Sequence, residues 1–360
     1  MATVYTNLKK ISDKNGEIEF RAEIAPETLE RYSLRELSHY AAGLALPGFR
    51  KGKVPEDIAR EHVGEMDLLE GAADDALRDA MAEIVANEKL NALGRPELTI
   101  LNIAPKNPLE FRIRFALAPD VSLPDYKKIA KVVAETKEEL AATDVEIDES
   151  IARIREFTAI GTPAKEGEKP APLTDEDVKK FGPFETVAAF RAEIAKNINQ
   201  EKESLAKDRK REEMVKAIVE RAKVKIPPML VEQELRGFTA ERDARIKDAG
   251  LSMEEYVKQM KKTEADLEKE ERAIIEEDIK TSLVIQAIRK MESLDPSERD
   301  VQIGIARLKM RYPDRDEDSL RRTAEAMALQ EKLFAMLEGS PEKTRARDTA
   351  KDATTKTEEK

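Results

Sequence analysis

A helical pattern that runs from Phe184 to Glu338 constrains this sequence more than any other feature. The pattern is helical almost throughout, with predicted breaks at Ile226-Pro227-Pro228, Gly250, Asp295-Pro296 and Tyr312-Pro313. Charged residues make up 38% of the 360-residue chain and aromatic residues only 4%, so its helices have few bulky side chains to bury. We therefore expect long amphipathic helices with thin cores, in an elongated protein rather than one large globule.

The first part of the chain mixes strands with helices. The predicted elements are strands over 3–11 and 17–24, a helix of about four turns from Pro26, helices over 55–63 and 65–90, and strands over 98–103 and 109–117. Asn15-Gly16 favours a tight hairpin turn between the first two strands. The alternation of Phe111, Ile113 and Phe115 with charged residues predicts a sheet with one buried face. Residues 1–119 are thus expected to form an α+β domain.

The region after residue 119 separates this domain from the helical one. Residues 120–135 have the pattern of an extended connector, and apolar spacing predicts a helix over 144–160. Residues 161–172 are rich in proline, glycine and charge, which predicts a linker. The helical domain is expected over 173–338. Residues 339–360 contain no aliphatic side chain larger than alanine, which predicts a disordered tail.

Composition excludes several classes of site. Cysteine is absent, so disulfides and Cys-ligated metal centres are impossible. The only histidines are His39 and His62, which are expected to have structural or solvent-facing roles. The sequence contains neither a phosphate-binding glycine loop nor a nucleophile elbow. We therefore predict no catalytic residue, no metal and no cofactor.

The net charge of −11 argues against a protein that wraps nucleic acid, although it leaves room for a local basic patch. The first residues lack the apolar core of a signal peptide, and no stretch approaches the roughly 18 apolar residues of a membrane span. These patterns predict a cytoplasmic protein without a membrane partner.

One short basic segment departs from this acidic average. Pro47-Gly48 ends the predicted first helix, and residues 49–55 read Phe-Arg-Lys-Gly-Lys-Val-Pro. Arginine binds phosphate or carboxylate through two hydrogen bonds, lysine adds charge, and phenylalanine buries apolar area on a partner. The alternative interpretation is a solvated turn whose charges keep the tip of the loop wet.

The segment from Gly48 to Pro55 resembles the ribosome-binding signature of the trigger factor family, bacterial chaperones that wait at the polypeptide exit tunnel. The resemblance implies that the ribosome is contacted by Gly48, Phe49, Arg50, Lys51, Gly52 and Lys53. Residues 115–123, 224–235 and 283–292 are similar to later parts of the same family, in the same order. The implied fold is an α+β ribosome-binding domain followed by an elongated all-α domain with helical arms.

The resemblance does not extend to one domain of the family. Typical members carry an FKBP-like prolyl isomerase domain of roughly one hundred residues after the first domain. Here residues 120–172 stand in its place, and Phe157 is the only aromatic residue between Tyr126 and Phe181. Because that isomerase grips proline with aromatic side chains, the resemblance implies a variant without the isomerase domain, a chaperone rather than an enzyme.

By this resemblance the chain would be an ATP-independent chaperone that docks at the exit tunnel and shields apolar segments of nascent polypeptides. Protein transport and cell division are further roles that the resemblance brings with it. The implied partners are the large ribosomal subunit through its proteins, with rRNA left open, and nascent or unfolded polypeptides. A weak homodimer is also expected, because exposed apolar patches favour self-association.

Client contacts are expected on the helical domain. The candidate residues are Met229, Phe238, Met253, Met260, Met310, Tyr312, Met327 and Phe334. Flexible thioethers suit promiscuous apolar contact, but the same side chains also fill thin helical cores, so ordinary packing is the alternative for each of them.

Two other functions stay open. One is a prolyl isomerase retained in reduced form, which a proline-peptide isomerisation assay would detect. The other is a cytosolic holdase or assembly factor that acts off the ribosome. In that case charge reversal at Arg50 and Lys51 would leave the holdase activity unchanged.

Overall fold

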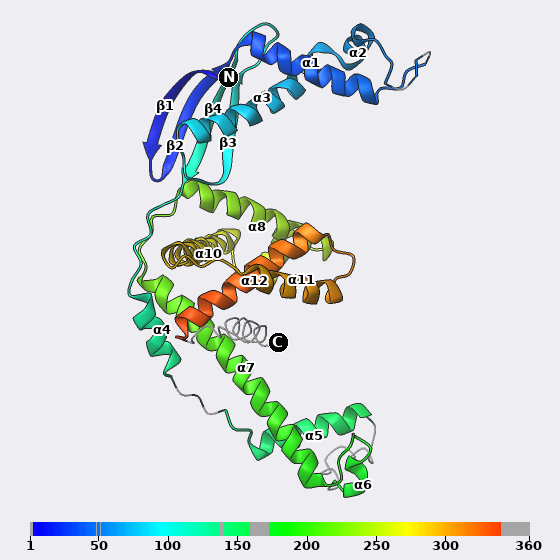
Figure 1. The fold of residues 1–360 in the computed structure, drawn as a ribbon, viewed down its shortest axis with the longest axis vertical. Helices are drawn as coiled ribbons and strands as arrows, with labels where there is room; N and C mark the ends of the chain where they lie inside the picture. Colours follow the sequence, from blue (N-terminus) through cyan, green and yellow to red (C-terminus); the bar gives the residue numbers. More distant parts are fainter. Residues whose placement is uncertain are drawn as a thin grey trace, which may run out of the picture. The chain divides into compact units, whose positions relative to one another are not determined.

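The computed structural model describes residues 3–47, 49–50, 52–136, 138, 140–158 and 173–339 (Figure 1). The chain forms two compact units, and each combines segments that are distant in the sequence. The first unit consists of Met1–Ser122 and Lys223–Val284, and the second of Leu123–Ala222 and Ile285–Lys360. The helical region predicted over 173–338 is therefore divided between the two units.

A four-stranded antiparallel sheet begins the first unit, with strand order β1-β2-β4-β3 (Figure 1). The strands are β1 (Thr6–Lys14), β2 (Glu17–Ile24), β3 (Ala92–Asn102) and β4 (Leu109–Leu117). Asn15 and Gly16 have φ angles of 57° and 76°, as a two-residue hairpin turn requires, so the predicted hairpin is confirmed. The strand predicted from residue 98 begins earlier, because a break in register between Leu93 and Glu97 accommodates a glycine and a proline.

Helices bury one face of this sheet. They are α1 (Pro26–Gly43), α2 (Glu56–Val63) and α3 (Glu65–Asn87). Alternate residues of β2 and β4, including Phe20, Phe111 and Phe115, are at most 2% exposed and form one cluster with side chains of α1 and α3. The alternation predicted from the sequence therefore marks the buried face, and α3 contributes small residues such as Ala72 and Ala76 to the same cluster.

Later helices complete the first unit. These are α8 (Pro228–Asp248), α9 (Met253–Gln259) and the first part of α10 (Glu264–Met291). Met229 and Leu230 at the start of α8 pack on Ala116 of β4. The guanidinium of Arg242 donates to both carboxylate oxygens of Glu271 at 2.8 Å, which holds α8 against α10.

The second unit is helical in its described residues. Its helices are α4 (Tyr126–Ala134), α5 (Asp144–Thr158), α6 (Asp175–Val178), α7 (Val187–Arg221), α11 (Glu298–Arg311), α12 (Glu317–Leu337) and the end of α10. Phe190 of α7 lies 5.3 Å from Phe181 and 5.1 Å from Phe184, measured between ring centroids, at the centre of the α5–α7 core. Val301 and Ile305 of α11 pack on Ala324 of α12.

One predicted element is wrong. The segment expected to be an extended connector over 120–135 contains helix α4, whose first turn is capped by the Asp125 carboxylate accepting from the Lys128 N–H. Tyr126 and Ala130, four residues apart, form its buried side. The predicted breaks in the helical region are confirmed between α7 and α8, at Gly250, and on either side of α11. The predicted linker over 161–172 and the tail from residue 340 lie outside the described residues.

Candidate functional site

The basic segment forms a hydrogen-bonded turn between α1 and α2. Helix α1 ends at Gly43, and the following backbone folds back on itself. The N–H of Phe49 donates to the Leu46 carbonyl at 3.0 Å, and the N–H of Lys53 donates to the Arg50 carbonyl at 2.9 Å. These bonds give the turn a defined shape.

Gly52 ties the turn to the end of α1. Its N–H donates to the Leu44 carbonyl at 3.3 Å, and its φ is +74°, a region that favours glycine. A β-carbon at this position would lie 3.1 Å from the Ala42 carbonyl oxygen. The close approach of two backbone segments therefore explains a glycine at position 52.

Apart from this hydrogen bond between Gly52 and Leu44, the turn exposes an aromatic ring and cations to solvent. Phe49 is 38% exposed, and Arg50 and Lys53 are exposed as well. Val54, by contrast, is 6% exposed and joins Leu37, Ala41, Ala59 and Leu68 in a small core between α1, α2 and α3. A buried valine thus anchors the base of the loop, whose tip can contact an anionic and partly apolar partner. Gly48 and Lys51, the other predicted members, lie outside the described residues.

In the first unit the predicted client residues differ in exposure. Phe238 of α8 is 42% exposed, Met260 after α9 is 46% exposed, and Met253 is half-buried. Met229 is 1% exposed, because it packs on Ala116 of the sheet. Met229 therefore belongs to the core in this structure and offers no surface to a client.

The second unit holds the remaining candidates. Met310 is 88% exposed, Tyr312 43% and Met327 52%. Phe334 is only 6% exposed, because the Arg211 guanidinium lies 4.7 Å from the centroid of its ring. Phe334 is therefore part of the packing between α7 and α12, and three of the four candidates in this unit remain accessible.

Other exposed apolar side chains were not among the predicted client residues. They include Leu205, Ile274 and Ile303 on helices and Leu98, Ile100 and Leu101 on β3. Helical spacing predicts that a residue belongs to an apolar stripe, but it does not tell whether another helix covers that part of the stripe. For β3 a signal existed: the Leu-Thr-Ile-Leu run contains neither charge nor proline.

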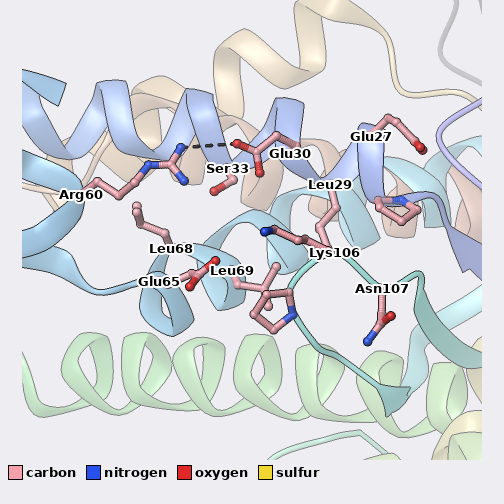
Figure 2. Close-up of a pocket in the computed structure, with 12 residues that line it drawn as sticks. Glu27, Leu29, Glu30, Ser33, Arg60, Glu65, Leu68, Leu69, Lys106 and Asn107 are labelled. Carbon is pink, nitrogen blue, oxygen red and sulfur yellow. Dashed lines mark hydrogen bonds and ion pairs between the residues drawn. The ribbon is translucent and has the colours of Figure 1, made fainter. Parts of the chain in front are cut away.

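A pocket of about 680 Å³ lies in the first unit, between α1, α2, α3 and the turn that joins β3 to β4 (Figure 2). The apolar part of the pocket wall is formed by Leu29, Leu68 and Leu69. The Arg60 guanidinium pairs with the Glu30 carboxylate at 3.4 Å across its rim. The chemistry of this pocket fits an apolar group bordered by charges of both signs.

Within the part of the chain that the structure describes, no group of three or more His, Asp or Glu side chains is arranged to hold a metal ion. His39 and His62 are both exposed. None of the described helices combines the length and apolar character that crossing a membrane would require.

Comparison with known proteins places this arrangement in a family. A solved structure described as promiscuous substrate recognition in folding and assembly activities of the trigger factor chaperone matches with a TM-score of 0.50 and 14% sequence identity, over 93% of this chain and 100% of that one. The trigger factor of Moorella thermoacetica is 25% identical over 77% of this chain and 80% of its own length. That of Carboxydothermus hydrogenoformans is 22% identical over 87% and 93%.

The relatives contain residues that this chain lacks. The alignments with the Carboxydothermus and Nostoc trigger factors run over 396 and 423 residues, more than the 360 residues of this chain. The two family models that match leave only residues 155–185 between them. A domain of roughly one hundred residues does not fit between the matched segments.

The family models account for both halves of the fold. The model of the bacterial trigger factor protein matches residues 5–154, which include the sheet and the basic turn. The model of the bacterial trigger factor C-terminus matches residues 186–338, which include α7 to α12. Together the two models cover most of the chain, which therefore belongs to the trigger factor family of chaperones.

Proposed function

We propose that this protein docks at the exit tunnel of the ribosome through the turn between α1 and α2, and shields apolar segments of nascent polypeptides in the cytoplasm without using ATP. The observation that carries the proposal is the geometry of the turn. Its base is fixed by Gly52 and by buried Val54, while Phe49, Arg50 and Lys53 are exposed. A fixed loop loses little conformational entropy when it binds.

The chemistry of the turn suits a ribosomal surface. Arg50 can bind a carboxylate of a ribosomal protein or an rRNA phosphate through two hydrogen bonds, and Lys53 adds a second positive charge. Phe49 can bury its ring in an apolar site on the same partner. Because two of the three contacts are ionic, binding should weaken as salt concentration rises.

The accessible client candidates are spread over both units. Phe238 and Met260 belong to the first unit, and Met310, Tyr312 and Met327 to the second. Each offers modest apolar area, so each contact with an unfolded chain would be weak and readily reversed. Release by this route needs no nucleotide hydrolysis, and the sequence contains no phosphate-binding glycine loop.

Ribosome co-sedimentation tests the docking step. The native protein is compared with Phe49→Ala/Arg50→Ala/Lys51→Ala at low and high salt. The matched control is Lys9→Ala/Ile11→Ala/Lys14→Ala, which removes two cations and one exposed apolar side chain from strand β1. We expect salt-sensitive binding by the native protein and by the control, and its loss in the loop variant.

A parallel assay measures how well each protein suppresses the aggregation of a denatured client. The loop variant should retain this activity, because the exposed apolar candidates are unchanged. If the loop variant sediments with ribosomes as well as the native protein does, the docking assignment is wrong. If the native protein suppresses aggregation but does not bind ribosomes, the holdase that acts off the ribosome becomes the better description.

A further inference from the structure

The two edge strands of the sheet are protected differently. Edge strand β1 carries Lys9, Lys10 and Lys14 and has two breaks in its register with β2, features that discourage further pairing. Edge strand β3 has a glycine, a proline and one register break in its first half, and a second break between Ile100 and Asn102 near its end. Residues 98–102, Leu-Thr-Ile-Leu-Asn, are all exposed and contain no charge. Between the two breaks, residues 97–100 pair in regular register with β4, so residues 98–100 form a short unprotected edge.

The hydrogen-bond pattern of β4 identifies which groups of this edge are free. The N–H of Leu117 donates toward the β2 side, to Gly16, and the N–H of Ala118 donates toward the β3 side, to Asn91. The direction of the backbone N–H and C=O groups alternates from residue to residue along a strand. Those of Arg114 and Arg112 therefore also point toward β3, where their backbone partners are Glu97 and Thr99.

The intervening residues of β3, Leu98 and Ile100, consequently direct their N–H and C=O groups away from β4. No described residue supplies a partner for these groups. Their side chains are opposite buried Ile113 and Phe111, yet they are 36% and 40% exposed. A strand added here would gain backbone hydrogen bonds and apolar contacts at once.

At one position of the same edge, a side-chain amide already forms hydrogen bonds with the backbone of β3. The N–H of Arg95 donates to Gln233 Oε1 at 3.2 Å, and Gln233 Nε2 donates to the Arg95 carbonyl at 2.6 Å. A single side-chain amide thus forms both bonds that a neighbouring strand would form. The next outward-facing backbone groups along β3, those of Leu98 and Ile100, have no such partner among the described residues.

We propose that residues 98–100 of β3 bind an extended segment of an unfolded polypeptide as a fifth strand of the sheet. The proposal rests on the chaperone function proposed above and adds a site to it. Backbone groups are common to every client, so strand addition would accept many sequences, while Leu98 and Ile100 would favour segments with apolar side chains at alternate positions.

A synthetic peptide tests this on the unmodified protein. The probe is a fluorescein-labelled peptide of eight alternating Val and Thr residues with a lysine at each end. The comparison peptide is N-methylated at two adjacent central residues, which removes a donor from each of its edges without removing apolar area. We expect fluorescence anisotropy to give at least tenfold weaker binding for the methylated peptide.

Protein variants locate the site. Ile100→Pro removes an outward-facing N–H and leaves the ladder with β4 intact, whereas Ile100→Ala removes the side chain and keeps the N–H. Ile11→Ala is the matched control on the other edge strand. We expect Ile100→Pro to weaken peptide binding at least tenfold, Ile100→Ala to weaken it less, and Ile11→Ala to leave it unchanged.

Equal binding of the two peptides by the native protein would overturn the proposal. If the native protein still suppresses aggregation in that case, the proposed chaperone function stands without the strand-addition site. A concentration-dependent dimer in sedimentation velocity that disappears in Ile100→Pro would also overturn it, because a second copy would then occupy the edge. Failure of the native protein in both the peptide and aggregation assays would refute the proposed function as well.

Discussion

Gly94 of β3 lies so close to Leu230 of α8 that a β-carbon on the glycine would be 2.8 Å from the leucine Cδ2. The same β-carbon would lie 2.9 Å from Gln233 Oε1. The φ of Gly94 is +66°, a region that favours glycine. The joint between the sheet and α8 therefore depends on the absence of a side chain at position 94.

Gly94→Ala should lower the free energy of unfolding by about 1–3 kcal/mol, because the new methyl group meets two side chains and forces a left-handed backbone. Urea unfolding followed by circular dichroism measures the change. Gly237→Ala is the matched control: it lies within α8, where a β-carbon meets nothing within 4 Å. It should raise the free energy of unfolding by about 0.5–1 kcal/mol. A shift in the same direction for both variants would contradict the steric explanation.

Gln233→Ala should release the backbone of Arg95. We expect faster hydrogen exchange at the Arg95 amide and a loss of about 1 kcal/mol of unfolding free energy, since two partly exposed hydrogen bonds disappear. Hydrogen exchange resolved by NMR provides the measurement. Glu232→Ala, on an exposed neighbouring position of α8, should leave that amide unchanged. Unchanged exchange in Gln233→Ala would mean that the amide pair does not hold the joint.

Elements with a strong local pattern could be predicted from the sequence. Asn15-Gly16 predicted the hairpin because the turn conformation is a property of those two residues. Phe111 and Phe115 predicted the buried face because strand periodicity is local as well. The start of β3 was missed because Pro96 is unfavourable in a strand, and only the register break and Gln233 of α8 make the extended backbone acceptable there.

Exposure depends on partners that are distant in the sequence, and this limited the prediction of client residues. Met229 lies at the start of α8 and Met310 near the end of α11, and Met229 is 1% exposed whereas Met310 is 88% exposed. The difference comes from Ala116, a sheet residue that packs on Met229. Phe334 is likewise covered by Arg211 from a separate helix. Whether these eight positions contact clients stays a prediction, most strongly supported where the side chain is accessible.

Two tyrosines should ionise at a higher pH than an ordinary tyrosine. The Tyr32 hydroxyl donates to Asp79 at 2.6 Å and that of Tyr126 to Glu292 at 2.5 Å. Burial, reinforced by these carboxylates, raises the pKa of each tyrosine to about 12. The chain has six tyrosines and no tryptophan, so ultraviolet absorbance reports their ionisation directly. We expect a late phase near pH 12 that Tyr32→Phe/Tyr126→Phe removes and that Tyr40→Phe, at an exposed position, retains.

The same shifts predict how stability depends on pH. Because the folded pKa exceeds the unfolded value of about 10, each tyrosine contributes stability that is fully present below pH ~10 and is lost as the pH rises through about 12. Urea unfolding at several alkaline pH values should therefore show a steeper loss for the native protein than for Tyr32→Phe/Tyr126→Phe. Parallel curves would contradict the assignment of the late phase to these two residues.

Gly52→Ala tests whether the shape of the basic turn, apart from its charge, matters for docking. The substitution places a methyl group 3.1 Å from the Ala42 carbonyl oxygen at a φ of +74°, so the turn must shift while every cation remains. Gly250→Ala is the matched control, because its φ is +73° but a β-carbon there meets nothing within 4 Å. Each variant should lose about 1 kcal/mol of unfolding free energy through backbone strain.

Only Gly52→Ala should weaken ribosome co-sedimentation, by about fivefold if roughly 1 kcal/mol of binding free energy is spent on restoring the turn. Charge alone cannot produce this result, since both variants keep Arg50, Lys51 and Lys53. Equal sedimentation of Gly52→Ala and Gly250→Ala would mean that the ribosome selects the cations of the turn without regard to the backbone that presents them.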